Sequence, residues 1–164
     1  MGVSGCGKST VGSALSGMLG WPFRDADEFH PAANIAKMRR GQPLTDADRW
    51  PWLEAMARFI DHELEAGRVA ILSCSALKRA YRRCIIGARE AVRLVYLKGD
   101  QELIFARLKA RTGHFMPPSL LDSQFAALQE PSPAEHALVV PITLSPEAAA
   151  GRIIAELGLA ARQR

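Results

Sequence analysis

The sequence opens with a segment that strongly restricts the fold, Gly2-Val3-Ser4-Gly5-Cys6-Gly7-Lys8-Ser9, which matches the pattern G-x-x-x-x-G-K-[ST]. Glycines let consecutive backbone N–H groups turn inward, so such a loop can surround phosphate oxygens. A helix that begins near Lys8 adds its positive N-terminal end. The pattern predicts that Lys8 reaches the β- and γ-phosphates of a nucleotide and that the Ser9 hydroxyl ligates Mg²⁺. The residues predicted to bind ATP in this segment are Gly2, Ser4, Gly5, Cys6, Gly7, Lys8, Ser9 and Thr10.

A loop of this kind normally follows a buried central strand, yet only Met1 precedes Gly2 here. Without that strand, backbone groups on both neighbouring strands lose partners, at a cost of roughly 1–3 kcal/mol for each buried unpaired group. Two explanations compete: a start codon placed too far downstream, which we favour, or a chain with impaired activity. The first explanation predicts that upstream in-frame codons encode about 5–10 mostly apolar residues, the usual length of a strand.

Predicted strands alternate with predicted helices along the rest of the chain. Strands are expected at 21–27, 68–74, 92–97 and 138–143, with the strand at 68–74 of a buried type, and helical segments are expected between and after them. Such alternation implies parallel pairing through right-handed crossovers. The predicted fold class is α/β: a three-layer sandwich around a parallel sheet, in a single domain spanning 1–164.

Composition narrows the function classes. The chain has 164 residues and a formal charge of +4, with basic residues in short groups, so we expect no nucleic-acid partner. No apolar run approaches the ~20 residues of a membrane span. The cysteines Cys6, Cys74 and Cys84 show no metal-ligand spacing and cannot all pair, which favours a reduced cytoplasm.

Several further blocks resemble the bacterial gluconate kinase family, whose members are P-loop kinases related to shikimate kinase. The blocks occur in family order from residue 2 to about 145: Asp25-Ala26-Asp27-Glu28-Phe29-His30-Pro31, Asn34, Lys37-Met38, Pro43 to Leu53, Cys74-Ser75-Ala76-Leu77-Lys78, Tyr81-Arg82, Leu97-Lys98-Gly99-Asp100, Arg107 to Arg111, Gly113-His114-Phe115-Met116, Leu121, Ser123-Gln124 and Glu130-Pro131. The resemblance implies ATP-dependent phosphorylation of D-gluconate to 6-phospho-D-gluconate with Mg²⁺, and it suggests a homodimer.

Acidic residues follow the strand at 21–27. Asp27 is expected at the carboxyl end of that strand, where open α/β sheets place ligands, and a carboxylate there can orient an attacking hydroxyl or accept its proton. The resemblance implies the same role. Helix capping, or contact with Mg²⁺ through water, is the alternative. Asp25 is the weaker candidate, because it is expected to point toward the opposite side of the sheet edge or into solvent.

A sugar acid needs cations to hold its carboxylate. Arg49 offers a planar two-pronged contact, and Lys78 and Arg82 stand at i, i+4 on a predicted helix after the strand at 68–74. For each of them the alternative is an ordinary solvated cation. His30 either contacts the substrate or orders the turn before Pro31, and the resemblance adds His114 to the substrate-binding set.

A lid is expected at about 107–120. Arg107 and Arg111 stand one helical turn apart and precede an irregular Gly- and Pro-containing segment. Arginines brought in by closure can neutralise charge that develops on the transferred phosphoryl group, and closure excludes water. Two arginines on a solvated helix face are the alternative.

Three functions stay open on the sequence. Gluconate phosphorylation leads, a related P-loop kinase acting on shikimate or a nucleoside monophosphate comes second, and a catalytically impaired nucleotide- or RNA-binding protein comes third. Arg83 and Pro141 depart from the family pattern, and Pro141 predicts an edge position for the strand at 138–143, because proline lacks a ladder donor.

Overall fold

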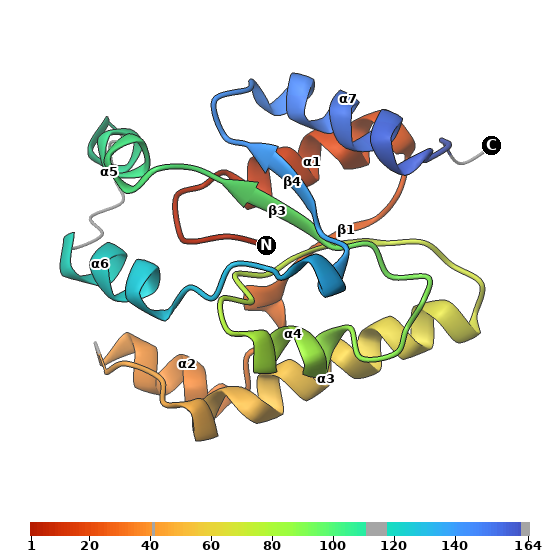
Figure 1. Ribbon diagram of the computed structural model, residues 1–164. Coiled ribbons are helices and arrows are strands. Elements are labelled where there is room, and N and C mark those ends of the chain that lie inside the picture. The colour runs from red at the N-terminus through yellow and green to blue at the C-terminus, as the bar shows by residue number, and fades with distance from the viewer. Residues whose placement is uncertain (41, 111–117, 162–164) are drawn as a thin grey trace.

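The computed structural model of the chain describes residues 1–40, 42–110 and 118–161. Helices and short strands alternate along it, as Figure 1 shows. The elements in chain order are α1 (Lys8–Leu19), β1 (Phe23–Asp25), the 3-10 turn η1 (Ala26–Phe29), α2 (Ala32–Arg39), α3 (Asp46–Glu65), β2 (Ile71–Ser73), α4 (Arg79–Ile85), β3 (Val95–Lys98), α5 (Gln101–Ala110), α6 (Pro118–Ala127), the 3-10 turn η2 (Pro133–Glu135), β4 (Leu138–Pro141) and α7 (Pro146–Leu157).

The strands form two parallel pairs, β1 with β2 and β3 with β4. Helices α1 and α7 cover one face of the strands, while α3 and α4 lie on the other (Figure 1). The predicted three-layer α/β architecture with parallel strands is therefore confirmed. Pro141, on β4, pairs with Lys98, on β3. Among the described strands β4 pairs only with β3, so the predicted edge position is also confirmed.

Local sequence signals set most helix ends. Gly20 ends α1 with a positive φ of 67°, and Ser145 caps α7 by accepting a hydrogen bond from the Ala148 N–H at 3.1 Å. Thr45 and Asp48 form a capping box at the start of α3. Helix α4 begins at Arg79, with Lys78 as its N-cap.

Two hydrophobic clusters hold the layers together. The first packs α1 and α7 against β3 and β4, with Val140 and Ile153 almost fully buried. The second packs α3 and α4 against η1, with Leu53 and Met56 at 0% exposure. No helix within the described part of the chain is both long and apolar enough to cross a membrane.

The chain enters the sheet between β2 and β3. The Leu97 N–H donates to the Met1 carbonyl at 2.9 Å, and the Gly2 N–H donates to the Ser75 carbonyl at 3.2 Å. Behind this entry point lies a mostly apolar cavity of about 360 Å³, lined by residues of both strands. It occupies the place in the sheet where the strand before the phosphate loop is expected.

Candidate active site

The phosphate loop adopts the backbone that its glycines permit. Gly5 and Gly7 have φ values of 81° and 95°, a region that other residues rarely adopt. A Cβ on Gly5 would lie 2.7 Å from the Leu108 side chain, whereas a Cβ on Gly7 would meet no atom within 4 Å. Helix α1 begins directly after Gly7, so its free N–H groups face this open space. The loop is therefore shaped to receive an anionic group.

Two side chains already contact the loop. The Lys8 ammonium donates to the carbonyl oxygens of Gly2 and Val3, each at 3.0 Å, so it lies over its own loop. The Gln124 side-chain oxygen, on α6, accepts from the Ser4 N–H at 2.6 Å. A carboxamide oxygen thus lies against a donor of the phosphate loop. Sequence reasoning gave Gln124 no role, because nothing local to it indicates contact with a loop 120 residues away.

Asp25 joins the end of the loop to the sheet, which corrects the expectation that it points away. Its Oδ2 accepts hydrogen bonds from the Ser9 hydroxyl at 2.8 Å and from the Ser73 hydroxyl on β2 at 2.7 Å. The physical reason is that β1 ends at Asp25, and η1 then turns the chain so that the Asp27 N–H donates to Asp25 Oδ1 at 3.1 Å. Burial raises the pKa of Asp25, but these three hydrogen bonds outweigh it and hold the pKa below its usual value. Asp25 is therefore an anion beside the Ser9 hydroxyl.

Asp27 lies next to this anion and faces solvent. Its side chain is 89% exposed, and its Oδ1 is 3.8 Å from His30 Nε2. Because Asp25 accepts hydrogen bonds from both the Ser9 hydroxyl and the Asp27 N–H, it links the end of the phosphate loop to the backbone of Asp27. The strand expected at 21–27 ends at Asp25, so Asp27 lies in η1, just past the carboxyl end of β1, and its role stays a prediction.

His30 is packed into the site rather than free in solvent. Its ring stacks on Trp52 with centroids 4.5 Å apart, and its side chain is 6% exposed. The Trp52 indole N–H donates to the Ala26 carbonyl at 2.7 Å, which fixes the stack against η1. Burial lowers the pKa of His30; Asp27 opposes and Arg49 reinforces this shift. Among the described side chains, buried His30 Nδ1 has no hydrogen-bond partner and so could accept or donate a bond to a ligand.

Arg49 and Lys78, both predicted to bind the substrate, lie close to the same side chain, Tyr81. The Arg49 guanidinium lies 5.9 Å from the Tyr81 ring centroid and donates to its hydroxyl at 3.4 Å. The Lys78 ammonium lies 5.5 Å from the same ring and binds both oxygens of Asp46, at 2.7 and 2.9 Å. Arg49 therefore has donors to spare, while Lys78 is engaged with a surface carboxylate. Lys78 precedes α4 as its N-cap rather than sharing a helix face with Arg82.

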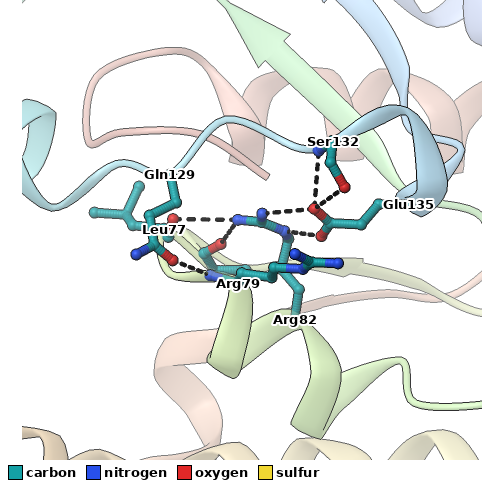
Figure 2. A network of polar contacts seen from close by, with 7 residues as sticks. Leu77, Arg79, Arg82, Gln129, Ser132 and Glu135 are labelled. Atoms are coloured by element: carbon teal, nitrogen blue, oxygen red, sulfur yellow. Dashed lines mark hydrogen bonds and ion pairs between the residues drawn. The ribbon is translucent and has the colours of Figure 1, made fainter.

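Arg82 does not belong to this cluster, and its predicted contact with a substrate was wrong. Its side chain is 2% exposed and binds both oxygens of Glu135, at 2.5 and 3.0 Å (Figure 2). It also donates to the carbonyl oxygens of Ala76 and Leu77, each at 3.1 Å. Figure 2 shows how this guanidinium ties the start of α4 to the segment before β4. With its donors used inside the protein, Arg82 cannot hold a substrate carboxylate.

A second pocket, of about 560 Å³, adjoins the phosphate loop. Its lining includes Gly5, Gly7, Thr10, Arg107 and the segment 141–146. This is a suitable volume for a nucleoside beside a phosphate cradle. Arg107 is exposed on α5 and lines this pocket, whereas Arg111 and His114 lie outside the described residues.

The known proteins that this chain resembles are kinases that act on small molecules. The family model described as shikimate kinase matches residues 4–155. A gluconokinase from Gluconobacter oxydans is 46% identical over 140 residues, which cover 85% of this chain and 79% of that protein. Among solved structures, a sugar kinase from Janibacter sp. superposes with a TM-score of 0.89 at 43% identity, covering 99% of this chain and 96% of the other. A gluconokinase from Sinorhizobium meliloti superposes with a TM-score of 0.79 at 39% identity, covering 96% and 93%.

Proposed function

The chain belongs to the gluconokinase family of P-loop kinases, and we propose that it transfers the γ-phosphoryl group of ATP to D-gluconate, giving 6-phospho-D-gluconate and ADP. The observation that carries this proposal is the high identity to gluconokinases over most of the chain. The site geometry supports it, because Asp25 links the Ser9 hydroxyl of the phosphate loop to the backbone of Asp27, whose carboxylate is exposed.

We assign the binding of the ATP phosphates to the loop amides, the N-terminus of α1 and Lys8. On nucleotide binding, the Lys8 ammonium would exchange its two carbonyl contacts for phosphate oxygens, which are stronger acceptors. The Ser4 amide would likewise exchange the Gln124 oxygen for phosphate. The nucleoside would occupy the pocket that Thr10 and Arg107 line.

Mg²⁺ fits the donor set at the end of the loop. The Ser9 hydroxyl and the Asp25 carboxylate are 2.8 Å apart, and both are oxygen donors of the kind that Mg²⁺ prefers. We propose that Ser9 holds the ion directly and that Asp25 holds it directly or through water. When bound, Mg²⁺ neutralises charge on the phosphates. A dedicated protein cage is not needed, since Mg²⁺ in kinases is bound by one or two protein groups plus phosphates and water.

Asp27 is the proposed acceptor of the proton from the gluconate hydroxyl. The hydroxyl oxygen forms a bond to the γ-phosphorus, the bond from that phosphorus to the bridging oxygen breaks, and the proton passes to the Asp27 carboxylate. Its 89% exposure leaves this carboxylate accessible to an acceptor that enters from solvent. His30, whose buried Nδ1 lacks a protein partner, would add a hydrogen bond to the same acceptor.

The gluconate carboxylate is assigned to Arg49, with Lys78 as a second cation. Arg49 keeps most of its guanidinium donors available, and the Tyr81 ring orients it. Lys78 would have to share its ammonium between Asp46 and the substrate. Arg107 is proposed to approach the phosphates on closure of a lid at about 107–120. Arg111 is retained as a prediction for the same lid, and His114 as a predicted substrate contact. Within this proposal the chain acts as one domain.

The cellular setting follows from the substrates. We propose a cytoplasmic enzyme, where ATP is abundant and thiols stay reduced; the cysteines Cys6, Cys74 and Cys84 are all free. No nucleic acid is part of the proposed reaction. A homodimer remains a proposal based on family resemblance.

The test is a coupled assay of ADP release with Mg-ATP and separate acceptors. Gluconate should support turnover, while shikimate, which the matching family model makes the second candidate, and nucleoside monophosphates should not. A Lys8→Met variant serves as the matched inactive control. Turnover with shikimate in preference to gluconate would overturn the proposed acceptor.

A further inference from the structure

Asp46 accepts hydrogen bonds from side chains of the kind that bind an acidic ligand. The Lys78 ammonium donates to both of its carboxylate oxygens, at 2.7 and 2.9 Å, and the Tyr81 hydroxyl donates to Oδ1 at 2.5 Å. Hydrogen bonds from Lys78 and Tyr81, together with the nearby charge of Arg49, hold the pKa of Asp46 below its usual value. An ammonium, a phenol and a guanidinium therefore gather near one carboxylate. We call Arg49, Lys78 and Tyr81 the acid cluster.

Arg49 connects the acid cluster to the residues assigned to the acceptor hydroxyl. On one side it donates to the Tyr81 hydroxyl at 3.4 Å, and this hydroxyl in turn donates to Asp46. On the other side lies His30, whose Nε2 is 3.8 Å from Asp27 Oδ1. Burial lowers the pKa of His30, Asp27 opposes this shift, and the charge of Arg49 reinforces it, so Arg49 is close to His30 as well. A molecule with a hydroxyl at Asp27 can therefore extend along Arg49 toward Asp46.

Asp46 can leave the acid cluster at little cost to the fold. Its side chain is 54% exposed, so it can turn into solvent. It is the first residue of α3, but the capping box of this helix is formed by Thr45 and Asp48. The positive N-terminal end of α3 favours an acidic side chain in its first turn, whether or not that side chain has another partner.

The donors of the acid cluster stay in place when Asp46 leaves. The Tyr81 ring is 97% buried and packs edge-on against Trp50, with ring centroids 5.9 Å apart. Its hydroxyl can therefore donate to a second carboxylate at the same point. Lys78 also needs an anion there, since a neutral ligand that displaced Asp46 would leave the ammonium without a charged partner. The cluster thus favours the exchange of one carboxylate for another.

We propose that the Asp46 side chain occupies the place of the substrate carboxylate, and that an acidic substrate displaces it to bind Lys78, Arg49 and the Tyr81 hydroxyl. This inference rests on the proposed function, and it adds Tyr81 to the residues that select an acid. Asp46 is then an internal competitor that weakens substrate binding, because the acid cluster accepts a ligand only in the fraction of molecules from which Asp46 has withdrawn.

The test uses three variants of the full chain. Asp46→Asn keeps the shape of the side chain and removes the competing charge. Glu54→Gln, also on α3, removes a charge from an exposed ion pair with Arg58 and is the matched control. Tyr81→Phe keeps the ring and removes the hydroxyl.

Binding is measured in the absence of ATP. The chain has two tyrosines, so the ring carbon that bears the hydroxyl gives two signals in carbon-13 NMR after tyrosine labelling. Tyr96, whose hydroxyl donates to Glu130 at 3.2 Å, is the internal reference for Tyr81. The probes are gluconate, the small acid glycolate, and sorbitol, a neutral polyol with as many carbons as gluconate. Calorimetry gives the Kd for each variant.

Gluconate should move the Tyr81 signal and leave the Tyr96 signal in place. Its Kd should fall about fivefold or more in Asp46→Asn, stay within about twofold in Glu54→Gln, and rise about tenfold in Tyr81→Phe. Sorbitol should bind Asp46→Asn no more tightly than the parent chain.

A Kd for gluconate that is unchanged or higher in Asp46→Asn would overturn the proposal, since Asp46 would then only join α3 to α4 or contact the substrate itself. Equal tightening for sorbitol would also overturn it. A Tyr81 signal that responds to glycolate but not to gluconate would support the carboxylate site and refute gluconate as the acceptor. No response to either acid in Asp46→Asn would overturn the site, whatever the turnover assay shows.

Discussion

Replacing Arg82 with methionine separates a structural role from a substrate-binding role. Arg82 is 2% exposed and holds Glu135 together with the carbonyl oxygens of Ala76 and Leu77. Methionine fills similar space but leaves the Glu135 carboxylate without its cation. Breaking a buried ion pair by removing one partner costs about 3–5 kcal/mol. We expect the free energy of unfolding to fall by that amount.

Urea unfolding followed by circular dichroism measures this loss. With a slope of about 2 kcal/mol per M, a loss of about 3 kcal/mol lowers the midpoint by roughly 1.5 M. The KM for gluconate of the folded variant, measured at low temperature, should stay within about twofold of the parent value. Glu135→Gln is the milder companion variant, and it should lower stability without changing KM. A KM that rises tenfold or more while stability is unchanged would refute the structural role.

The same pair predicts a pH dependence. Hydrogen bonds from Arg82 lower the pKa of Glu135 to about 2, whereas the unfolded chain has a glutamate pKa of about 4.3. Because the folded pKa is the lower one, the stabilisation is fully present above about pH 4.3 and is lost as the pH falls toward 2. The Arg82→Met variant should lose this part of the acid sensitivity. An unchanged acid unfolding profile would contradict the ion pair.

Three further predictions concern the reaction. Asp25→Asn removes the negative charge beside Ser9, so the Mg²⁺ concentration needed for half-maximal turnover should rise about tenfold or more in a magnesium titration at fixed ATP. An unchanged titration would exclude Asp25 from the ion site. Asp27→Asn should lower kcat about 10²–10⁴-fold with little change in ATP binding, and a parent-like kcat would remove it as the proton acceptor. Arg107→Ala should lower turnover much more than nucleotide affinity measured by calorimetry, and equal losses in both would contradict a lid role.

The parts of the structure that local sequence determines could be predicted. The glycine spacing predicts the phosphate loop, and the capping residues Thr45 and Ser145 set the starts of α3 and α7. Alternation of strands and helices predicts parallel pairing, which β1–β2 and β3–β4 both have. In each case the signal lies within one or two turns of the chain.

The features that sequence reasoning missed depend on distant partners. Lys78 and Arg82 share i, i+4 spacing, but Arg82 turns inward because Glu135, 53 residues later, supplies a carboxylate there. Asp25 faces the phosphate loop because Ser73 and Ser9, from different elements, converge on it. Gln124 reaches Ser4 across 120 residues. Spacing along one element cannot reveal such contacts.

The most direct test of the proposed function is a phosphorus NMR spectrum of the reaction of the purified protein with Mg-ATP and gluconate. The account predicts one phosphomonoester signal that couples to the C6 protons of gluconate and grows in step with ADP. ADP accompanied only by inorganic phosphate, or a spectrum in which ATP is not consumed, would contradict it.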